Sequence, residues 1–233
     1  MCSHTTIHEM QSLCRAAMAH LTARLRPGMH LTEVRRIAED YLLAGGADSF
    51  WYHGVGAFVF SGTDTAVSVS GRTYRTPDAV LGETDILTVD LSPQRGGVWG
   101  DYARTILLQN GQVISEADAV ENGEWRAGLK TELALHDALR ECAAPQTTFA
   151  ELHRRMNDRI TAAGYENVDF LGNLGHSIAR DPAQRIYIEP GNTAPLSAVP
   201  AFTFEPHIRR PGSPYGFKME NIYRFAGGSL TAE

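Results

Sequence analysis

The sequence predicts an α+β fold, with a pseudo-twofold antiparallel sheet that carries its helices on one face. Helix-like segments are followed by strand-like segments twice along the chain, and the strand-like segments are short and separated by Gly or Pro. The chain has 233 residues, of which 43% are apolar, and no linker or low-complexity run divides it. We therefore expect a single domain over residues 1–233.

The first round opens with two helices. Apolar residues recur at steps of three and four between positions 7 and 25, which indicates an amphipathic helix. Pro27 and Gly28 interrupt this pattern. Thr32 is then the expected N-cap of a second helix, which ends at the glycine pair 45–46.

Strand-like sequence follows these helices. Residues 50–70 are aromatic, β-branched and punctuated by glycine, which predicts a strand, a loop and a second short strand. Residues 85–108 predict a β-hairpin that turns at a Gly-rich segment and ends at Asn110-Gly111.

The second round repeats this order. Helices are expected from Ser115 to Cys142 and from Phe149 to Ala163, the latter ending at Gly164. Four short β-like segments complete the chain: NVDFLGNLGHSIA, RIYIEP, AFTFEPHIRR and YGFKMENIYRF.

Composition excludes several classes of function. A net charge of −6 and a pI of about 5.8, without any Lys/Arg block, argue against binding to nucleic acid or to a membrane surface. The N-terminus lacks the apolar core of a secretory signal, and no run approaches the roughly 20 apolar residues of a membrane helix. Cys2, Cys14 and Cys142 are scattered and odd in number, which suggests free thiols in a reducing cytoplasm.

Two carboxylates stand in the predicted hairpin. Asp90 lies late in its first arm and Asp101 early in its second, so both side chains can face the same side. Close carboxylates repel one another unless a cation lies between them. The pair therefore indicates either a metal site or a solvated loop.

Three further candidate ligands lie in the C-terminal half, each near a Gly or Pro: His176, Glu205 and Glu220. Each alone has an ordinary structural explanation, such as pairing of Glu220 with Lys218 or Arg224 on a solvated face. With the two aspartates they form an oxygen-rich set, which suits two neighbouring divalent ions better than one structural zinc.

The order and spacing of these residues resemble the pita-bread-fold metallopeptidases, which include methionine aminopeptidase, aminopeptidase P, prolidase and creatinase. That family combines a D-x10-D hairpin, a His in a GHxIG-like turn, a Glu in a TxEP strand and a Glu in a late strand. Here the two aspartates are eleven positions apart (101 − 90 = 11), and GHSIA, FTFEP and KMEN follow in the same order. Two opening helices joined by RPGM also match, so the resemblance covers essentially the whole chain.

The resemblance implies a dinuclear metal site. Asp90 and Asp101 would hold one ion, His176 and Glu205 the other, and Asp101 and Glu220 would bridge them. The ions would lower the pKa of a shared water molecule, and Glu205 would act as general base and then as general acid. Mn²⁺ or Fe²⁺ would suit the set best, with Co²⁺ and Zn²⁺ as alternatives.

The substrate side departs from the family pattern. Peptidases of the family usually carry one histidine upstream of the hairpin and another seven residues after the metal-binding histidine. Val69 and Ser70 stand near the first place and Ala183 at the second. His53 and His207 are the candidates to take over, by donating a hydrogen bond to a developing oxyanion, although each has a structural explanation too.

Other residues fall where the family's substrate wall would lie. Arg180, Arg185 and Tyr187 could bind a substrate carboxylate or form a solvated edge. Three aromatic residues are expected in the core or the pocket lining: Trp51, Tyr52 and Trp99.

We therefore expect a cytoplasmic metal-dependent hydrolase, either an aminopeptidase or a relative acting on a small amide or amino-acid-derived substrate. The N-terminal domain of prolidase-like and creatinase-like relatives is expected to be missing. A non-peptidase enzyme of the same fold, creatinase-like or a lyase, is the first alternative. A non-catalytic peptide- or protein-binding module is the second, and the retained carboxylates argue against it. The expected partner is a short peptide or small molecule, with a homodimer left open.

Overall fold

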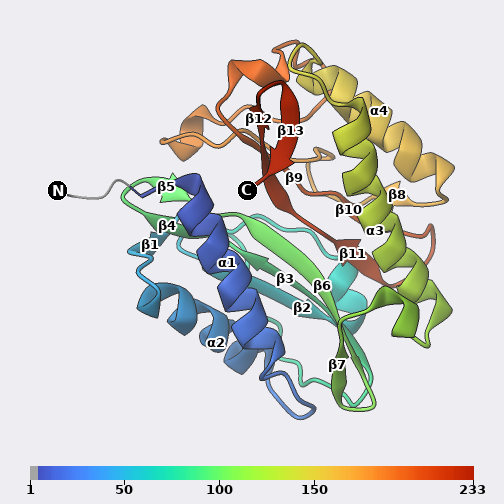
Figure 1. Ribbon diagram of the computed structural model, residues 1–233. Helices are drawn as coiled ribbons and strands as arrows, with labels where there is room; N and C mark the ends of the chain where they lie inside the picture. The colour runs from blue at the N-terminus through green and yellow to red at the C-terminus, as the bar shows by residue number, and fades with distance from the viewer. Residues whose placement is uncertain (1–4) are drawn as a thin grey trace.

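The computed structural model describes residues 5–233, in which pairs of helices and groups of strands alternate along the chain (Figure 1). The helices are α1 (Ile7–Thr22), α2 (Leu31–Ala44), α3 (Gly123–Cys142) and α4 (Phe149–Ala162). The strands before α3 are β1 (Ser49–Phe50), β2 (Ala57–Ser61), β3 (Asp85–Leu91), β4 (Pro93–Arg95), β5 (Val98–Trp99), β6 (Tyr102–Gln109) and β7 (Gln112–Ile114). Those after α4 are β8 (Glu166–Asn167), β9 (Phe202–Phe204), β10 (His207–Arg209), β11 (Gly216–Lys218), β12 (Asn221–Ala226) and β13 (Ser229–Ala232).

The strands form small antiparallel sheets in both halves of the chain. In the N-terminal half the main sheet has the order β2-β3-β6-β7, and β1-β4-β5 form a separate small sheet beyond its end. In the C-terminal half the orders are β11-β10-β8 and β13-β12-β9. Two rounds of a helix pair with antiparallel strands agree with the predicted arrangement.

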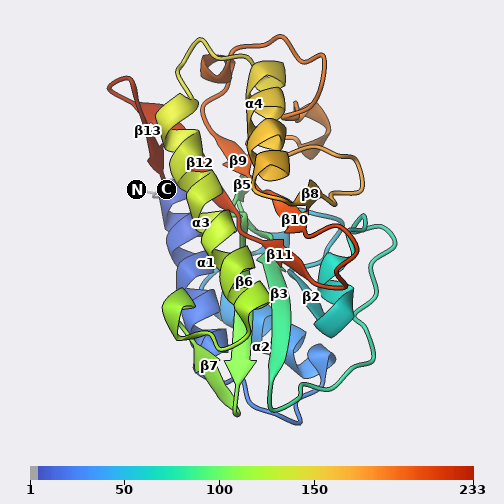
Figure 2. The same cartoon turned by 90° about the vertical axis from the view of Figure 1, so that its right-hand side faces the viewer.

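The helices cover the outer side of these sheets (Figures 1 and 2). The pair α1 and α2 contacts β2 and β6, whereas α3 contacts β10 and β11 and α4 contacts β8. Capping boxes fix the starts of α1 and α4, with Thr6 and Glu9 at the first and Thr148 and Glu151 at the second. Within residues 5–233, no helix has both the length and the apolarity needed to cross a membrane.

Side-chain alternation on β3 divides the core in two. Leu87, Val89 and Leu91 pack in the cluster formed with α1 and α2. Ile86 belongs to the cluster that includes α3, α4 and the C-terminal strands. Because side chains alternate across a strand, Asp90 points with Ile86 to the side away from α1 and α2.

The two halves meet where β6 runs alongside residues 216–221. The Thr105 hydroxyl accepts a hydrogen bond from Lys218 N at 2.8 Å and donates one to Lys218 O at 3.1 Å. One step further along, Glu220 N donates to Ala103 O at 3.0 Å. These contacts bring the last predicted ligand against the hairpin.

Several element boundaries differ from the prediction. The helix α2 begins at Leu31 after His30, so Thr32 is not its N-cap. The helix α3 begins at Gly123 rather than Ser115, because the Asn122 side chain accepts hydrogen bonds from two backbone N–H groups of the first turn.

Other differences concern the strands. The strand, loop and second short strand expected within residues 50–70 correspond to β1, the turn after it and β2, and residues 67–70 form a loop. Much of 168–200 consists of turns with isolated bridges such as His176 with Tyr187. The strand β13, which pairs with β12, was not predicted. Cys14 and Cys142 are free thiols as expected, and Cys2 lies outside the described residues.

Candidate metal centre

The first two predicted ligands are positioned by the β3–β6 hairpin and by α1. Asp90 lies on β3, and Asp101 immediately precedes β6. The Gln11 side chain of α1 donates to Asp101 O at 2.8 Å and accepts from Asp101 N at 3.1 Å. Gly100 permits this close approach, since a Cβ at that position would lie 2.7 Å from Cys14 Sγ. The backbone of Asp101 is therefore held from both sides.

His176 is held by Thr203 of β9. The His176 N–H donates to Thr203 Oγ1 at 3.0 Å, and Thr203 N donates to His176 O at 2.7 Å. Gly175 has a φ of 136°, and a Cβ there would lie 2.3 Å from Thr203 O, so only glycine fits. Nδ1 of the ring lies 3.0 Å from Ser177 O. The neutral ring therefore carries its proton on Nδ1 and presents the lone pair of Nε2 to the centre.

The two glutamates come from the ends of short strands. Glu205 follows β9, and its N–H donates to Leu174 O at 3.0 Å, which places it beside the segment that carries His176. Glu220 lies between β11 and β12, with a fully buried side chain. Its carbonyl accepts a hydrogen bond of 2.7 Å from Arg104 Nη1.

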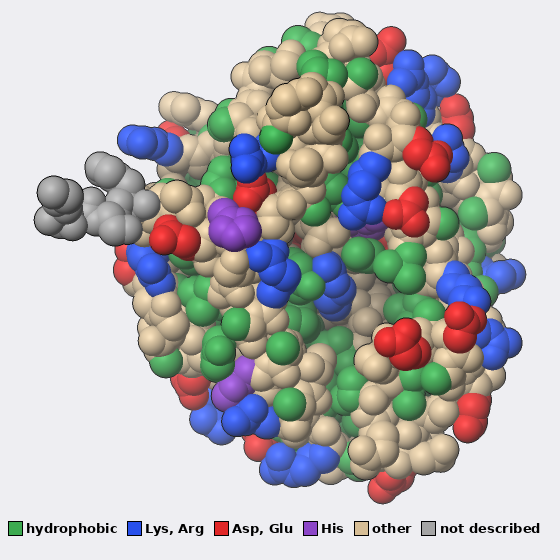
Figure 3. Space-filling model, viewed as in Figure 1, with side chains coloured by type: hydrophobic (Ala, Val, Ile, Leu, Met, Phe, Trp, Pro, Cys, Tyr) green, Lys and Arg blue, Asp and Glu red, His purple; other side chains and the backbone are tan. Residues whose placement is uncertain are grey.

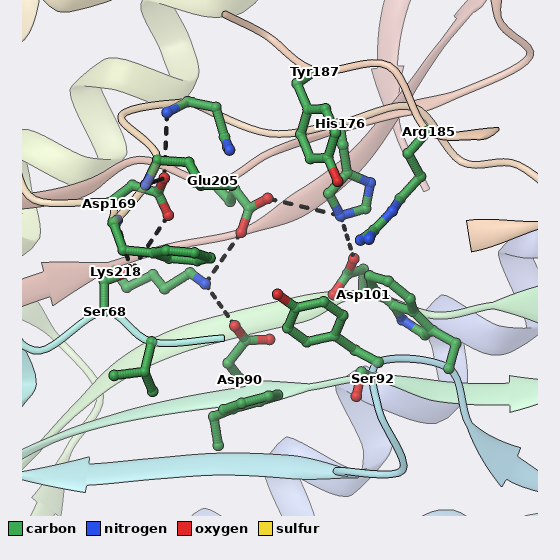
Figure 4. A pocket seen from close by; sticks show the side chains of 17 residues that line it. Ser68, Asp90, Ser92, Asp101, Asp169, His176, Arg185, Tyr187, Glu205 and Lys218 are labelled. Atoms are coloured by element: carbon green, nitrogen blue, oxygen red, sulfur yellow. Dashed lines mark hydrogen bonds and ion pairs between the residues drawn. The ribbon is translucent and has the colours of Figure 1, made fainter. Parts of the chain in front are cut away.

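All five predicted ligands converge. His176 Nε2 lies 3.3 Å from Asp101 Oδ2 and 3.8 Å from Glu205 Oε1. Figure 4 shows Asp90, Asp101, His176 and Glu205 pointing into one pocket from different elements. Glu220 is fully buried, and its carboxylate lies within 4.8 Å of ligand atoms of the other four residues.

The ligand atoms fall into two overlapping groups. One, the histidine group, contains Asp101, His176 and Glu220; the other, the carboxylate group, contains Asp90, Glu205 and Glu220. In each group the ligand atoms lie within 4.8 Å of one another. Glu220 belongs to both, which is the position expected of a bridging ligand. Glu205 groups with Asp90, so the pairing of ligands drawn from the resemblance stays a prediction.

The residues present suit a bound cation. Within residues 5–233, Asp101 Oδ2 and both Glu220 carboxylate oxygens are buried and accept no hydrogen bond. Buried carboxylate oxygens without a partner are costly, and a divalent ion would supply the missing interaction. Carboxylates with one imidazole form a donor set typical of Mn²⁺, Fe²⁺, Co²⁺ or Zn²⁺.

Burial and mutual repulsion shift the protonation of this cluster. Burial raises the pKa of Asp101 to about 7, and the nearby His176 partly opposes the rise. Burial, followed by the charges of Asp101 and Glu205, raises the pKa of Glu220 well above its usual value. Burial alone would lower the pKa of His176, but the contact with Asp101 raises it. Such groups bind protons when no metal ion is present, so metal binding will release protons.

Lys218 contacts two of the predicted ligands, a position that the sequence analysis did not give it. Its Nζ lies 2.6 Å from Asp90 Oδ2 and 3.2 Å from Glu205 Oε2. Burial would raise the pKa of Glu205, but the charges of Lys218 and His176 lower it. The sequence contained a hint of this position: residues 218 and 220 are two apart in a β-like segment, so their side chains are expected on the same side of the strand.

The pocket wall combines aromatic rings with a cation. Arg185 Cζ lies 4.8 Å from the Trp51 ring, 5.4 Å from Tyr52 and 5.6 Å from Tyr187. Arg185 Nε donates to Pro182 O at 2.9 Å. Within residues 5–233, the two terminal amino groups of Arg185 have no hydrogen bond or ion pair. Figure 4 shows this side chain beside His176 and Asp101.

An additional carboxylate lines the same pocket. Asp169 was not among the predicted site residues, yet it faces the cavity opposite the aromatic wall. Burial and the charge of Glu205 raise its pKa. Its oxygens accept hydrogen bonds from Leu171 N at 2.9 Å and Asn173 N at 3.3 Å, so it also orders its own turn.

The two histidines predicted to contact substrate lie outside this pocket lining. His53 is an exposed turn residue with a φ of 56°, and its ring centre lies 4.9 Å from that of Tyr52 at an interplanar angle of 54°. His207 is buried, with Nε2 2.7 Å from Thr65 O, and lines a smaller neighbouring pocket with Asp90 and Lys218. Burial and the charge of Lys218 lower the pKa of His207 to about 4, so its neutral ring spends its N–H on Thr65. Neither geometry presents a donor to the centre, and their roles in catalysis stay predictions.

The remaining predicted residues divide between pocket and core. Val69 and Tyr187 line the pocket, whereas Trp99 is fully buried and stacks on Trp51 with ring centres 4.6 Å apart. Arg180 lies at a separate apolar groove. Ala183 lies in a short 3-10 turn.

A fold of two helix-and-sheet halves around buried carboxylates and one histidine defines the pita-bread class of metal-dependent hydrolases. A sequence model described as metallopeptidase family M24 matches residues 5–225. The chain therefore belongs to metallopeptidase family M24, which confirms the expected family and class of enzyme.

Similar proteins agree with this assignment. Methionine aminopeptidase of Helicobacter pylori (strain ATCC 700392 / 26695) is 28% identical over 211 residues, which cover 87% of this chain and 78% of that protein. The X-Pro aminopeptidase of Thermotoga maritima has a TM-score of 0.79 at 19% identity, covering 97% of this chain and 59% of that one. The prolidase of Pyrococcus horikoshii has a TM-score of 0.80 at 18% identity, covering 97% and 60%.

These structural neighbours confirm the predicted pita-bread fold. The chain spans about three fifths of the length of the two solved structures, from 59% to 60%.

Proposed function

We propose that this chain is a metal-dependent hydrolase that cleaves an amide bond in short peptides or peptide-like molecules. The observation that carries the proposal is the convergence of four carboxylates and His176 at one site, with buried carboxylate oxygens that lack partners. Three of these carboxylates and the histidine line one pocket. Divalent ions in this site, Mn²⁺ or Fe²⁺ by preference, would polarise the scissile carbonyl and lower the pKa of the attacking water.

The protein's own groups have separate roles in this proposal. The ions would be held by five side chains: Asp90, Asp101, His176, Glu205 and Glu220. Glu205 faces the same space and is the proposed general base, which takes the proton of the attacking water and passes it to the leaving amine. Its lowered pKa keeps it ionised and able to accept that proton at neutral pH.

Arg185 favours a substrate that carries a carboxylate. Its guanidinium is held against aromatic rings beside the centre, while its terminal amino groups lack a partner within residues 5–233. A guanidinium fork binds a carboxylate through two parallel hydrogen bonds. A dipeptide or an N-acyl amino acid would place its carboxylate there and its amide bond over the centre.

A second candidate is a non-peptidase amide hydrolase or lyase of the same fold. It is favoured by Ala183 and Val69, which stand where peptidases of this fold usually have histidines, and by the loss of the His207 N–H to Thr65 O. The face drawn in Figure 3 intersperses acidic and basic side chains, which agrees with a small-molecule substrate rather than nucleic acid.

The test is a panel of substrates offered to protein loaded with Mn²⁺, Fe²⁺ or Co²⁺. The panel contains N-terminal Met peptides, Xaa-Pro dipeptides, other dipeptides, N-acyl amino acids and guanidino metabolites. We expect hydrolysis of at least one carboxylate-bearing member, and a loss of about 10³-fold or more with Asp101→Asn, because the ion site loses a charged ligand.

Asp40→Asn is the matched control, because Asp40 is an exposed residue paired with Arg36 on α2. It should leave the rate unchanged. Cleavage confined to Met peptides would favour aminopeptidase activity, and turnover of guanidino metabolites alone would favour the second candidate. Equal rates for wild type and Asp101→Asn would contradict the proposed centre.

A further inference from the structure

We propose that the ammonium of Lys218 competes with a divalent ion for the carboxylate group, so that the two ion positions of this centre fill in sequence rather than together. This inference rests on the proposed function and deepens it. The first ion enters the histidine group, formed by Asp101, His176 and Glu220. A second ion binds between Asp90 and Glu205 only by displacing the Lys218 ammonium.

The geometry of the carboxylate group supports this competition. Lys218 Nζ contacts Asp90 Oδ2 at 2.6 Å and Glu205 Oε2 at 3.2 Å, so one cation already joins the two carboxylates that would receive the ion. The Lys218 side chain is only 17% exposed. A buried ammonium between two carboxylates neutralises part of the charge that would attract a divalent ion.

The position of Lys218 is built into the backbone. The Thr105 hydroxyl bonds both its N–H, at 2.8 Å, and its carbonyl, at 3.1 Å. The strand β11 also pairs Lys218 with His207 of β10. A tethered ammonium has a high effective concentration at its site, so it competes even at low concentrations of free metal ion.

The histidine group holds no comparable side-chain cation. Within residues 5–233, no lysine or arginine forms an ion pair with the carboxylates of Asp101 or Glu220. The contact of Asp101 Oδ2 is with His176 Nε2, 3.3 Å away, and both residues belong to the ligand set that the first ion would join. The second ion must in addition separate Asp90 and Glu205 from Lys218.

Titration of the metal-free protein with Zn²⁺ alone, followed by calorimetry and by native mass spectrometry, tests the inference without any turnover. Wild type should show one strong binding event and a second at least tenfold weaker. Lys218→Met should strengthen the second event at least tenfold and leave the first within about threefold. Lys218→Arg, which keeps the charge, should retain a weak second event.

The sequence offers a control and a spectroscopic reporter. Lysine occurs at only two positions, Lys130 and Lys218. Lys130 lies on α3 and pairs with Asp118, so Lys130→Met should leave both binding events unchanged. With ¹³Cε-labelled lysine, the signal that disappears in Lys218→Met identifies Lys218. That signal should move with the second equivalent of Zn²⁺ more than with the first.

Different results would overturn different claims. Two equally strong events in wild type, or a second event that Lys218→Met does not strengthen, would overturn the inference and leave the proposed function standing. Absence of Zn²⁺ binding to wild type would overturn the proposed function itself. If Lys218→Met does not fold, Lys218→Gln and the wild-type lysine signals decide the question, because a signal that moves with the first equivalent contradicts displacement at the second.

Discussion

The two halves of the chain supply ligands to the same centre by different means. Asp90 and Asp101 come from one hairpin, in which β3 and β6 pair without interruption from Asp85 with Leu108 to Leu91 with Tyr102. His176 and Glu205 come from short segments joined by an isolated bridge and a few backbone hydrogen bonds. Asp90 is therefore fixed by strand pairing, and Asp101 directly precedes the paired segment and is also held by Gln11. The second pair depends on a few contacts between distant parts of the chain.

This difference predicts where the centre is easiest to break. A regular hairpin distributes the position of its side chains over many hydrogen bonds, so loss of one changes little. A segment that is positioned by a single tight backbone contact has no such additional hydrogen bonds. One extra side-chain atom at that contact is enough to displace the metal ligand that the segment carries.

Gly175→Ala should have the largest effect of the changes that leave every ligand in place. The backbone φ of 136° is strained for any residue with a Cβ, and that Cβ would lie 2.3 Å from Thr203 O. We expect a loss of about 3 kcal/mol or more in the free energy of unfolding. We also expect at least a tenfold loss in affinity for the first Zn²⁺, measured by urea unfolding and calorimetry.

Gly172→Ala distinguishes backbone strain at a positive φ from the steric contact with Thr203 O. Gly172 also has a positive φ, of 71°, but nothing lies within 4 Å of its added Cβ. It should cost about 1–2 kcal/mol from backbone strain alone and leave Zn²⁺ affinity unchanged. Equal effects of the two variants on Zn²⁺ binding would show that the Gly175 approach does not position His176.

The same contrast explains how much the sequence could predict. Residue types and spacing placed Asp90 and Asp101 on one hairpin, because strand alternation is a local rule. They also gave the identity of His176, Glu205 and Glu220. Local rules could not assign the 3-10 turns and bridges of residues 168–200, since their contacts join residues far apart in the sequence, such as Thr148 with Pro195 and Ser177 with Phe202.

The sequence also could not predict the surroundings of individual side chains. His207 and His53 looked equivalent as hydrogen-bond donors, yet one is bound to Thr65 O and the other is exposed. The contact between Lys218 and Asp90 joins residues 128 positions apart, and no local pattern specifies which strand faces which. The neutralisation of Asp90 and Glu205 by Lys218 could therefore be recognised only in the three-dimensional structure.

Titration of the buried Asp101 carboxyl group should make the stability of the metal-free protein depend on pH. Burial raises the pKa of Asp101 to about 7 from an ordinary value of 3.8, so the folded protein holds a proton that the unfolded chain releases. Stability of the metal-free protein from this group is therefore full below about pH 4 and is lost as the pH rises toward 7. The slope is at most about 1.4 kcal/mol per pH unit, measured by urea unfolding in the presence of a chelator.

Asp101→Asn removes this contribution together with the effect of Asp101 on the pKa values of His176 and Glu220. His207, whose pKa is lowered to about 4, acts in the opposite direction because its unfolded form binds a proton below pH 6.5. That effect is present in both proteins and cancels in their difference. The difference in stability between wild type and Asp101→Asn should shift in favour of the variant from pH 5 to pH 7. A pH-independent difference would contradict the buried, protonated Asp101.

A further test concerns the contact that joins the two halves, where the expected loss of stability is smaller than that of Gly175→Ala. Thr105→Val keeps the shape of the side chain but removes the hydroxyl that bonds both Lys218 N and Lys218 O. We expect a loss of about 1–3 kcal/mol in the free energy of unfolding, because two backbone groups lose their partner. Thr105→Ser keeps the hydroxyl and should recover most of this loss. If β11 alone holds Lys218, the ¹³Cε signal of Lys218 will be the same in Thr105→Val as in wild type. A shift of that signal in Thr105→Val but not in Thr105→Ser means that β6 positions the Lys218 ammonium between the carboxylates of both halves.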